Sequence, residues 1–496
     1  MQDEKPKNTA LFRFLRQPQS FSQAGDQGYL LGLRGFFTLS SFIWVFLTTF
    51  APVCVKDAAN RKGPFWQEVL RDIFSVLFWN QSLIYSFFII LSARTVGIPF
   101  LLSSSKIVVA SAVLRRGLRL WFPVAVSLAV VKIFSSTIGT GYIDDFKSST
   151  GNVSFDTPYS IPNALAYFNS VFNIFWTTSK FFEQAGNIAF PSQTLWIVNV
   201  IYAQSYTVYM TMVIIPYTRN SWRVKAYIAF IITAWWVQSW AWYTITGLLF
   251  ADVVMNMNFK ERSHRGIKIW RNIRCPLWVP ATVLILAGLV MQYLWTVWRP
   301  QYANKELVAH TGLYYTGGLN TSPNLVEPQA RDDIYLVVLG SFLLLESSDF
   351  LQKAFQNPLF LYLGRRSLSK SCTSLLPLFF PWHRIPTASH HALLFLPFAP
   401  PPSHHPHHHP PPPPYSISLT PPLTGWFLTQ SIIIYTAGIK LHQNLTLTHN
   451  VPDSGATAVC FLVCLPTLVF FAESFYRLVD WPSCILAGVV FDWIRE

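Results

Sequence analysis

Long apolar runs, each close to the thickness of a lipid bilayer, dominate this chain of 496 residues. About 20 apolar residues in a helix cross the hydrocarbon core, and a helix satisfies its own backbone polar groups there. Only 12% of the residues are charged, against about 25% in soluble domains. The sequence therefore predicts an all-α integral membrane protein. The apolar runs lie near 35–53, 77–93, 120–136, 194–216, 224–257, 277–297, 334–350, 427–439 and 457–473.

The run at 224–257 decides the expected number of crossings, because it is too long for one span and short for two. Basic residues mark cytoplasmic loops, and they flank this run on both sides. Both of its ends are therefore expected in the cytoplasm, so the run crosses the membrane twice. This gives a bundle of about ten transmembrane helices with both termini cytoplasmic. The flanking basic residues are Arg219, Arg223, Lys225, Lys260, Arg262, Arg265, Lys268, Arg271 and Arg274.

Three Asn-x-Ser/Thr sequons give an independent check on this topology. Asn152, Asn320 and Asn444 begin these sequons, and each falls in a loop that the ten-span topology places outside the cytoplasm. All three are therefore candidate glycosylation sites. The first outer loop fits less well, because it carries basic residues that acidic ones only partly offset. Those basic residues are Lys56, Arg61, Lys62 and Arg71.

The net charge of +14 does not indicate nucleic-acid binding, because the basic residues fall mainly in short loops and no nucleic-acid-binding motif is visible. We expect membrane lipid as a partner and no nucleic acid. Cys460 and Cys464 are spaced as on one face of a helix, which favours two small packed side chains over a metal or redox site. No metal site is expected.

Residues 370–425 break the pattern of apolar runs, since they hold 15 of the 34 prolines, 8 of the 12 histidines and no acidic residue. Such a segment is not expected to form a helix or a packed core. It is either translated intron or a disordered cytoplasmic loop. The expected organisation is a cytoplasmic tail at 1–28, spans one to eight at 29–369, this insert, the last two spans at 426–480 and a C-terminal tail at 481–496.

Three short motifs carry a resemblance to a known family. The stretch Gly32–Gly35 reads Gly-Leu-Arg-Gly before an apolar run, Arg116 and Arg119 lie three apart, and 363–369 reads Leu-Gly-Arg-Arg-Ser-Leu-Ser. Together they resemble acyltransferase family 3, over about residues 29 to 480. The resemblance implies a multi-pass protein that transfers an acyl group, usually acetyl, from acyl-CoA to a hydroxyl of a sugar, a lipid or a small molecule. It implies no permanently bound cofactor, with acyl-CoA as the donor substrate.

The resemblance also assigns roles to single residues, and two of the family's positions differ here. Arg34 matches an arginine that the family's catalytic histidine follows, but the histidine position holds Val45. Ile201 stands where many members have a glutamate. An isopropyl group cannot accept and return a proton as imidazole does. The chain therefore resembles an acyltransferase that lacks its usual base.

A group of three arginines before the run at 120–136 has two interpretations. Arg115, Arg116 and Arg119 could hold the phosphates of coenzyme A, since guanidinium groups bind phosphate oxygens bidentately. They could equally be ordinary charges that orient the following span. The sequence leaves both interpretations open.

Acidic residues within or beside apolar runs are the candidates for a replacement acid or base, because ionisable groups in a membrane are costly. These candidates are Glu346, Asp349 and Glu473, with Asp252 as a further one. Two functions stay open. The chain is either an acyltransferase with a rearranged base or an inactive family member acting as a transporter, a lipid-binding protein or a membrane scaffold. The expected location is the endomembrane system or the plasma membrane of a eukaryote.

Overall fold

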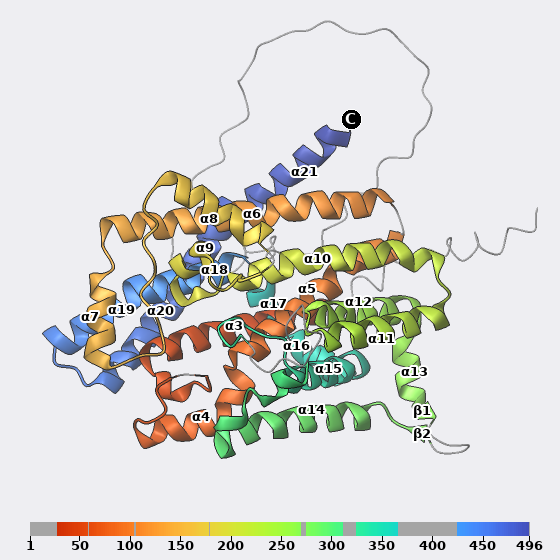
Figure 1. Ribbon diagram of the computed structural model, residues 1–496, viewed down its shortest axis with the longest axis horizontal. Coiled ribbons are helices and arrows are strands. Elements are labelled where there is room, and N and C mark those ends of the chain that lie inside the picture. The colour runs from red at the N-terminus through yellow and green to blue at the C-terminus, as the bar shows by residue number, and fades with distance from the viewer. Residues whose placement is uncertain are drawn as a thin grey trace, which may run out of the picture. The chain divides into compact units, whose positions relative to one another are not determined.

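The computed structural model describes residues 27–57, 59–103, 106–177, 179–268, 274–310, 324–365 and 424–495, and nearly all of them lie in helices or short turns (Figure 1). Each predicted apolar run contains a helix. Residues 1–26 and almost all of the predicted insert at 370–425 lie outside the described part of the chain.

Ten helices coincide with the predicted spans. Their bounds are α3 (Gly28–Phe50), α5 (Gln81–Ser103), α6 (Lys106–Thr137), α10 (Trp196–Ile214), α11 (Asn220–Trp236), α12 (Ala241–Asn256), α14 (Trp278–Tyr293), α15 (Asp332–Ser347), α18 (Thr424–Ile433) and α20 (Asp453–Phe475).

Six helical segments among the described residues are long and apolar enough to cross a membrane, and a seventh joins them if α15 and the following α16 (Asp349–Phe355) count as one bent span. These two helices meet at an angle of 101°. The helices α11 and α12 have 17 and 16 residues, which is short for a crossing. The structure is that of an all-α protein with membrane-spanning character, and the figure of ten spans stays a prediction.

Shorter elements connect the long helices. The helical ones are α4 (Phe65–Phe78), α7 (Gly141–Thr150), α8 (Ala164–Trp176), α9 (Ala185–Ala189), α13 (Phe259–Arg265), α17 (Pro358–Arg365), α19 (Ile439–Gln443) and α21 (Trp481–Arg495). Two antiparallel strands, β1 (Ile267–Lys268) and β2 (Arg274–Cys275), form a small hairpin. Single turns of 3₁₀ helix are η1 (Pro52–Cys54), η2 (Pro191–Gln193), η3 (Ile215–Tyr217), η5 (Pro300–Tyr302) and η6 (Lys305–Ala309). Turns of π-helix are η4 (Leu294–Trp298), η8 (Ile434–Gly438), η9 (Asn444–Thr448) and η10 (Tyr476–Asp480).

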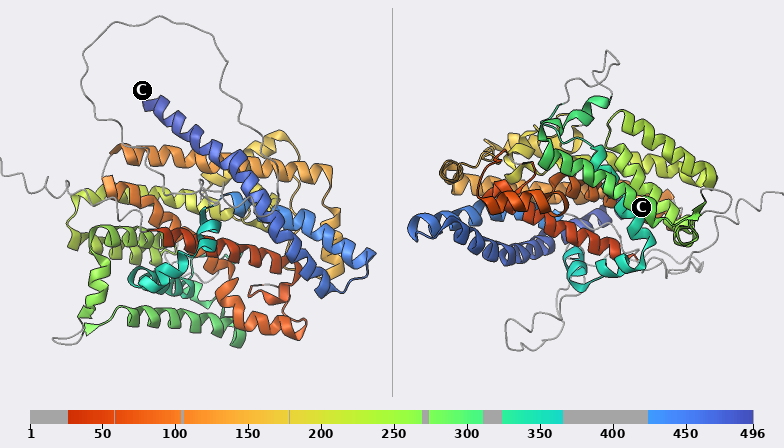
Figure 2. Two further views of the ribbon diagram at one scale, coloured as in Figure 1. Left: turned by 180° about the vertical axis from the view of Figure 1, so that it is seen from behind. Right: turned by 90° about the horizontal axis from the view of Figure 1, so that it is seen from below.

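The C-terminal segment differs from the prediction. Residues 481–496 were expected to be a tail, but 481–495 form α21, which packs along α6 (Figure 2). Its buried residues, Ser483 and Ala487, lie four apart and so on one face, whereas Ile485 and Val489 are among its exposed apolar side chains. Small buried side chains allow a helix to pack closely against its neighbour.

Glycines bring helices into close contact at the start of α3. A Cβ atom on Gly35 would lie 2.2 Å from the carbonyl oxygen of Phe360, and one on Gly364 would lie 2.1 Å from that of Leu31. Small residues allow such backbone contacts between membrane helices, where van der Waals packing drives association. The motif at 32–35 therefore meets the described part of the motif at 363–369, residues 363–365, where α3 crosses α17.

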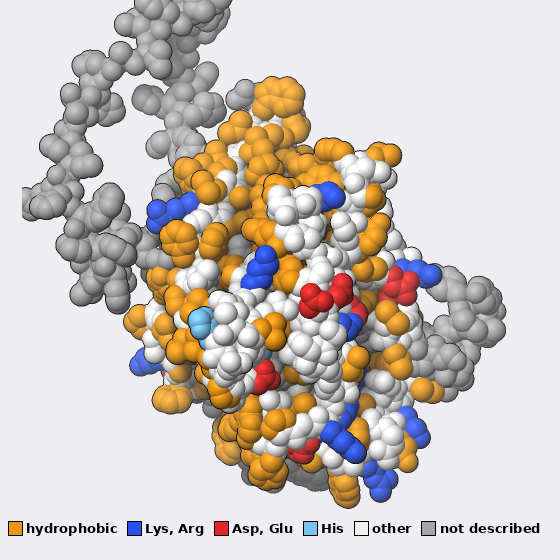
Figure 3. Space-filling view, turned by 90° about the vertical axis from the view of Figure 1, so that its left-hand side faces the viewer, with side chains coloured by type: hydrophobic (Ala, Val, Ile, Leu, Met, Phe, Trp, Pro, Cys, Tyr) orange, Lys and Arg blue, Asp and Glu red, His pale blue; other side chains and the backbone are white. Residues whose placement is uncertain are grey.

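The bundle has two distinct ends. Four segments contact one another at one end: the start of α3, the end of α5, the start of α6 and the end of α15. We call this end of the bundle the arginine end. It lies toward the right in Figure 1, on the side of α13 and the β hairpin. The opposite end carries α7 and the loop between α3 and α4. Viewed from that side, acidic and basic side chains are scattered among apolar and neutral ones (Figure 3).

The helix α8 enters the bundle from the opposite end and the chain then turns back. The Tyr167 hydroxyl donates to the carbonyl of Ala125 in the middle of α6 at 2.7 Å. The amide nitrogen of Asn199 donates to the carbonyls of Ile174 and Thr177, at 2.6 and 2.7 Å. Asn199 thus satisfies carbonyl groups that the end of α8 leaves without helical partners. This stretch was not among the predicted apolar runs.

Candidate functional site

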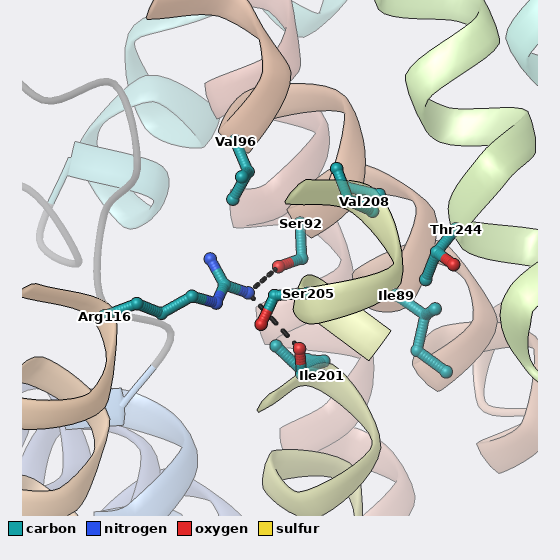
Figure 4. Close-up of a pocket in the computed structure, with 9 residues that line it drawn as sticks. Ile89, Ser92, Val96, Arg116, Ile201, Ser205, Val208 and Thr244 are labelled. Carbon is teal, nitrogen blue, oxygen red and sulfur yellow. Dashed lines mark hydrogen bonds between the residues drawn. The ribbon is translucent and has the colours of Figure 1, made fainter. Parts of the chain in front are cut away.

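A small cavity at the arginine end lies between α5, α6, α10 and α12. Arg116 reaches into it from α6, and its Nη2 donates to the Ser92 hydroxyl at 2.7 Å and, at 3.5 Å, to the carbonyl of Ile201 (Figure 4). The cavity has room for about one water molecule, and its remaining walls are aliphatic side chains together with Ser205 and Thr244, whose hydroxyls donate to backbone carbonyls of their own helices. It presents one cation within mostly apolar walls, a setting that favours contact with a negatively charged group.

Two further arginines lie near Arg116. Arg34 is buried in α3, with 3% of its surface exposed. The positive charges of Arg116 and Arg119 act on the Arg34 guanidinium, so the three groups lie within electrostatic range of one another. Clustered like charges with low-dielectric walls create a positive potential that attracts anions. The structure thus brings together three of the arginines that the motifs singled out.

Arg115 points elsewhere. Arg115 Nη2 lies close to α21, 3.6 Å from the position that a Cβ atom on Gly488 would occupy. The charge of Asp492 on the same helix also acts on Arg115. Arg115 thus lies against α21, while the charge of Arg119 acts on both Arg115 and Arg34.

Tyrosines of α10 border the Arg116 guanidinium. Tyr202, Tyr206 and Tyr209 recur at helical spacing, and the hydroxyls of Tyr202 and Tyr206 are 2.7 Å apart. Tyr209 donates to the carbonyl of Ala112 on α6 at 3.2 Å and also interacts with Arg116. These contacts fix α10 against α6 beside the cavity.

A buried ion pair lies at the same end. Arg94 Nε of α5 is 3.2 Å from Glu346 Oε1 of α15, and the two side chains are 0% and 1% exposed. The Tyr29 hydroxyl of α3 donates to Glu346 Oε2 at 2.6 Å. One carboxylate thus joins three helices. Because an unpaired charge would be very costly here, these groups stabilise one another.

Each acidic candidate for a replacement base is paired with a basic side chain. Glu346 pairs with Arg94 as described, and Asp349 is exposed and pairs with Lys260. Glu473 accepts from Arg477 one helical turn away at 2.6 Å. Buried Asp252 lies 3.1 Å from Arg223 Nε. None of these four carboxylates lines the Arg116 cavity, so the structure does not bring them together with the arginines as a general base.

Val45 and Ile201, which stand where acyltransferase family 3 motifs have ionisable residues, are both buried. Val45 is 1% exposed in the apolar core, and its place on the uninterrupted helix α3 puts it about 16 Å along the axis from Arg34. Ile201 is 8% exposed and lines the Arg116 cavity, where its carbonyl group faces the guanidinium.

Two described histidines, His310 and His442, are buried, and both lie at the opposite end of the bundle. His442 of α19 is 3% exposed, with its Nε2 3.3 Å from Asp453 Oδ1 at the start of α20. Its ring stacks on Phe50 at 5.3 Å and meets Phe146 edge to face. It lies beyond Phe50, the last residue of α3, and so far from the Arg116 cavity.

The sequons have different environments. Asn152 is 1% exposed and its amide nitrogen donates to the carbonyls of Thr48 and Thr49, both at 2.9 Å. A glycan on that nitrogen would have to displace these contacts, and glycosylation at Asn152 stays a prediction. Asn320 lies outside the described residues. Asn444 is exposed near the end of its helix and stays a candidate.

Sequence reasoning did not single out Arg94, Tyr29 or Ser92. Arg94 could have been recognised from the sequence, because it directly follows the predicted run at 77–93, which holds no charged residue. Its partner Glu346 was recognised, but 252 residues separate the two in the chain, and only the fold pairs them.

Comparisons with known proteins identify no relative. No protein-family model matches this chain, no curated protein matches it, and no solved structure matches its fold. The resemblance to acyltransferase family 3 therefore rests on the short motifs.

Proposed function

We propose that this chain is a multi-pass membrane protein of acyltransferase-3 type that binds acyl-CoA at its arginine end and transfers the acyl group, acetyl being the usual one, to a hydroxyl of a sugar, a lipid or a small molecule. The observation that carries the proposal is Arg116 lining a cavity, with the charges of Arg116 and Arg119 both acting on the buried Arg34. Coenzyme A carries a diphosphate and a further phosphate, and guanidinium groups bind such oxygens bidentately.

The charge balance at this end supports an anionic ligand. Arg94 is neutralised by Glu346, and Arg115 lies near Asp492. Arg116 makes its described hydrogen bonds to neutral groups, a serine hydroxyl and a backbone carbonyl. Its positive charge is therefore left for a ligand, and phosphate groups would meet that need.

The packing of the two motifs adds a second line of support. The Gly-Leu-Arg-Gly stretch that contains Arg34 contacts the segment around Gly364 through glycines at both positions. In the acyltransferase-3 interpretation, this contact fixes α3 and hence the buried Arg34 guanidinium. The motifs then have a shared structural purpose at the donor end.

Acyl transfer breaks the thioester C–S bond of acyl-CoA and forms an ester with the acceptor oxygen, while the acceptor's proton passes to the thiolate of CoA. General-base assistance to that proton transfer is typically worth about 10² to 10⁴ in rate. Val45 and Ile201 cannot supply it. The proposal therefore includes slow transfer that depends on positioning of donor and acceptor, with the acceptor's own chemistry deciding the rate.

A second candidate function is a non-catalytic one, as a transporter, a lipid-binding protein or a membrane scaffold. The observation that favours it is the pairing of Glu346, Asp349, Glu473 and Asp252 with basic side chains, which leaves none of these carboxylates positioned as a base. The two functions differ in turnover and also in binding, because an acyltransferase must bind acyl-CoA whereas a scaffold need not.

Incubation of the purified full-length protein with acetyl-CoA and candidate hydroxyl acceptors separates these functions, with release of the CoA thiol as the measured quantity. Acceptor-dependent thiol release that Arg116→Ala abolishes and Arg219→Ala retains would support acyl transfer. Arg219 is an exposed arginine outside the site and serves as the matched control. Saturable binding without thiol release for any acceptor would favour the non-catalytic function.

The proposal extends to topology and location. We place the arginine end in the cytoplasm, where acyl-CoA is available, with about ten spans and both termini on that side. The basic residues around α13 lie at this same end, as the positive-inside rule expects. The protein would act in the endomembrane system or the plasma membrane of a eukaryote.

A further inference from the structure

Two buried carboxylates share one arginine at the opposite end of the bundle. Arg331 precedes α15, and its Nε lies 2.8 Å from Glu306 Oε1 and 3.4 Å from Asp333 Oδ1. The side chains of Glu306 and Asp333 are 6% and 0% exposed. The cluster joins the 3₁₀ turn η6 to the first turn of α15, and it has no part in the function proposed above.

The remaining donors of Arg331 are bound elsewhere. Its Nη2 donates to the carbonyl of Ala303, and its Nη1 donates to the side-chain oxygen of Asn304 at 3.3 Å. The guanidinium also lies over the Trp295 ring, 5.6 Å from its centre. Arg331 is therefore held in place and cannot turn to give each carboxylate a full bidentate contact.

The charges around the pair do not balance. Oε1 and Oε2 of Glu306 and Oδ2 of Asp333 are buried without an aligned hydrogen-bond donor among the described residues. Other charged or titratable groups facing the cluster are acidic, phenolic or imidazole groups: Asp332 of α15, Asp57 of the first loop, Tyr243 of α12 and His310 after η6. Asp332 is itself engaged by the Trp235 indole at 2.7 Å and lies 3.9 Å from His310.

We propose that Glu306, beside Asp333 and Arg331, is a proton-binding site that holds a proton at neutral pH, with Arg331 neutralising the remaining negative charge. Two carboxylates at one guanidinium carry a net charge of about −1, and an uncompensated buried charge is far costlier than a bound proton. The proton gives a buried carboxyl oxygen a hydrogen atom to donate. It also removes the repulsion between the two groups.

The pKa of Glu306 agrees with this proposal. Burial, and next the charge of Asp333, raise the pKa of Glu306 to about 8, against the opposing effect of Arg331. In the unfolded chain a glutamate releases its proton near pH 4.3. Because the pKa of Glu306 is higher in the folded protein than in the unfolded chain, protonation of Glu306 favours folding, and this contribution is largest at low pH. This contribution is lost progressively as the pH rises from about 4.3 to 8, by up to tenfold in the unfolding equilibrium constant for each pH unit.

The site would make the bundle responsive to the pH of the compartment it faces. Below about pH 8 protonated Glu306 lets η6 pack against α15, and above it the ionised Glu306 carboxylate adds a repulsive charge at that contact. The other end of α15 carries Glu346 of the buried ion pair. Proton release at one end of this helix would therefore act on an element that also belongs to the arginine end.

Infrared spectroscopy of the full-length protein in lipid nanodiscs tests the proposal, because a protonated carboxyl group has a C=O stretch distinct from that of a carboxylate. The wild-type protein should show a carboxylic-acid band at pH 7 that disappears with a midpoint near pH 8. Glu306→Gln should remove that band, whereas Asp145→Asn, which changes an exposed carboxylate in α7, should retain it.

Asp333→Asn provides a second variant. With one carboxylate left for Arg331, Glu306 should ionise at a pH at least one unit lower, so the midpoint of the band should shift downward. A wild-type spectrum without any carboxylic-acid band that titrates between pH 7 and 9 overturns the proposal. So does such a band that persists unshifted in both variants. If neither variant folds, the titration of the wild-type protein decides. A midpoint of the carboxylic-acid band below pH 6 contradicts a proton bound at Glu306 at neutral pH.

Discussion

Replacing Arg94 with methionine would test the buried ion pair that joins α5 to α15. Methionine fills a similar volume without a charge, so Arg94→Met leaves the Glu346 carboxylate in a site that is 1% exposed. Among the described residues, the Tyr29 hydroxyl would then be the remaining donor to it, at 2.6 Å. The variant separates the contribution of the guanidinium from that of side-chain packing.

The expected loss follows from the burial of both partners. Removing one member of a buried pair costs about 3 to 5 kcal/mol, because the other charge is left uncompensated. Replacing both with apolar residues, in Arg94→Met/Glu346→Leu, should recover most of that loss, since such double replacements are often neutral or stabilising. Tyr29→Phe removes one hydrogen bond to a charged group and should cost about 1.5 to 3 kcal/mol.

The assay is equilibrium unfolding of the purified protein in mixed micelles, followed by tryptophan fluorescence. Arg477→Met is the control, because this arginine is 59% exposed in its pair with Glu473 and its loss should cost at most about 1 kcal/mol. The reasoning is refuted if Arg94→Met is as stable as the wild type, or if the double variant is no more stable than Arg94→Met alone.

Three further outcomes are expected. Gly35→Ala should reduce the folded yield in size-exclusion chromatography, because its Cβ would lie 2.2 Å from a backbone oxygen. Gly141→Ala is the control and should behave as the wild type, because no atom lies within 4 Å of its Cβ. Equal yields of the two variants would contradict the close packing at Gly35. Glycosidase treatment should leave the mobility of Asn320→Gln/Asn444→Gln unchanged, because the buried amide nitrogen of Asn152 already donates to two backbone carbonyls. A mobility shift that also requires Asn152 would refute this. Val45→His should raise CoA thiol release by about 10² or more if the rest of the acyl-transfer site is intact, and no change would favour the non-catalytic function.

The apolar runs predicted the helices because membrane helices form from local sequence. A run such as 334–350 satisfies its own backbone hydrogen bonds, so length and composition suffice to place a helix there. The helix α15 (Asp332–Ser347) follows that run closely. The same reasoning placed Glu346 near the end of a span and identified it as a costly group in need of a partner.

The elements that the sequence did not predict depend on tertiary contacts. The helix α8 was not expected, and its end is capped by Asn199, which lies outside that helix in the sequence. The sequence of 481–495 was taken as a tail because it follows the last apolar run, yet it packs along α6 as α21. In both cases the stabilising partner is distant along the chain.

The candidate site shows the same division. The short motifs identified Arg34, Arg116 and Arg119, which the fold places near one another. Spacing alone grouped Arg115 with them, although consecutive residues on a helix point about 100° apart. Arg115 accordingly faces α21 instead of Arg34. The buried pair of Arg94 with Glu346 required the fold, because no local pattern relates residues on two separate helices.

Calorimetric binding of acetyl-CoA to the full-length protein in detergent tests the central claim most directly. The account predicts saturable binding to the wild type and to Arg219→Ala, with binding weakened at least tenfold in Arg116→Ala/Arg119→Ala. Absence of binding to a well-folded wild-type sample would contradict the assignment of the arginine end as an acyl-CoA site, as would equal affinity in the double variant.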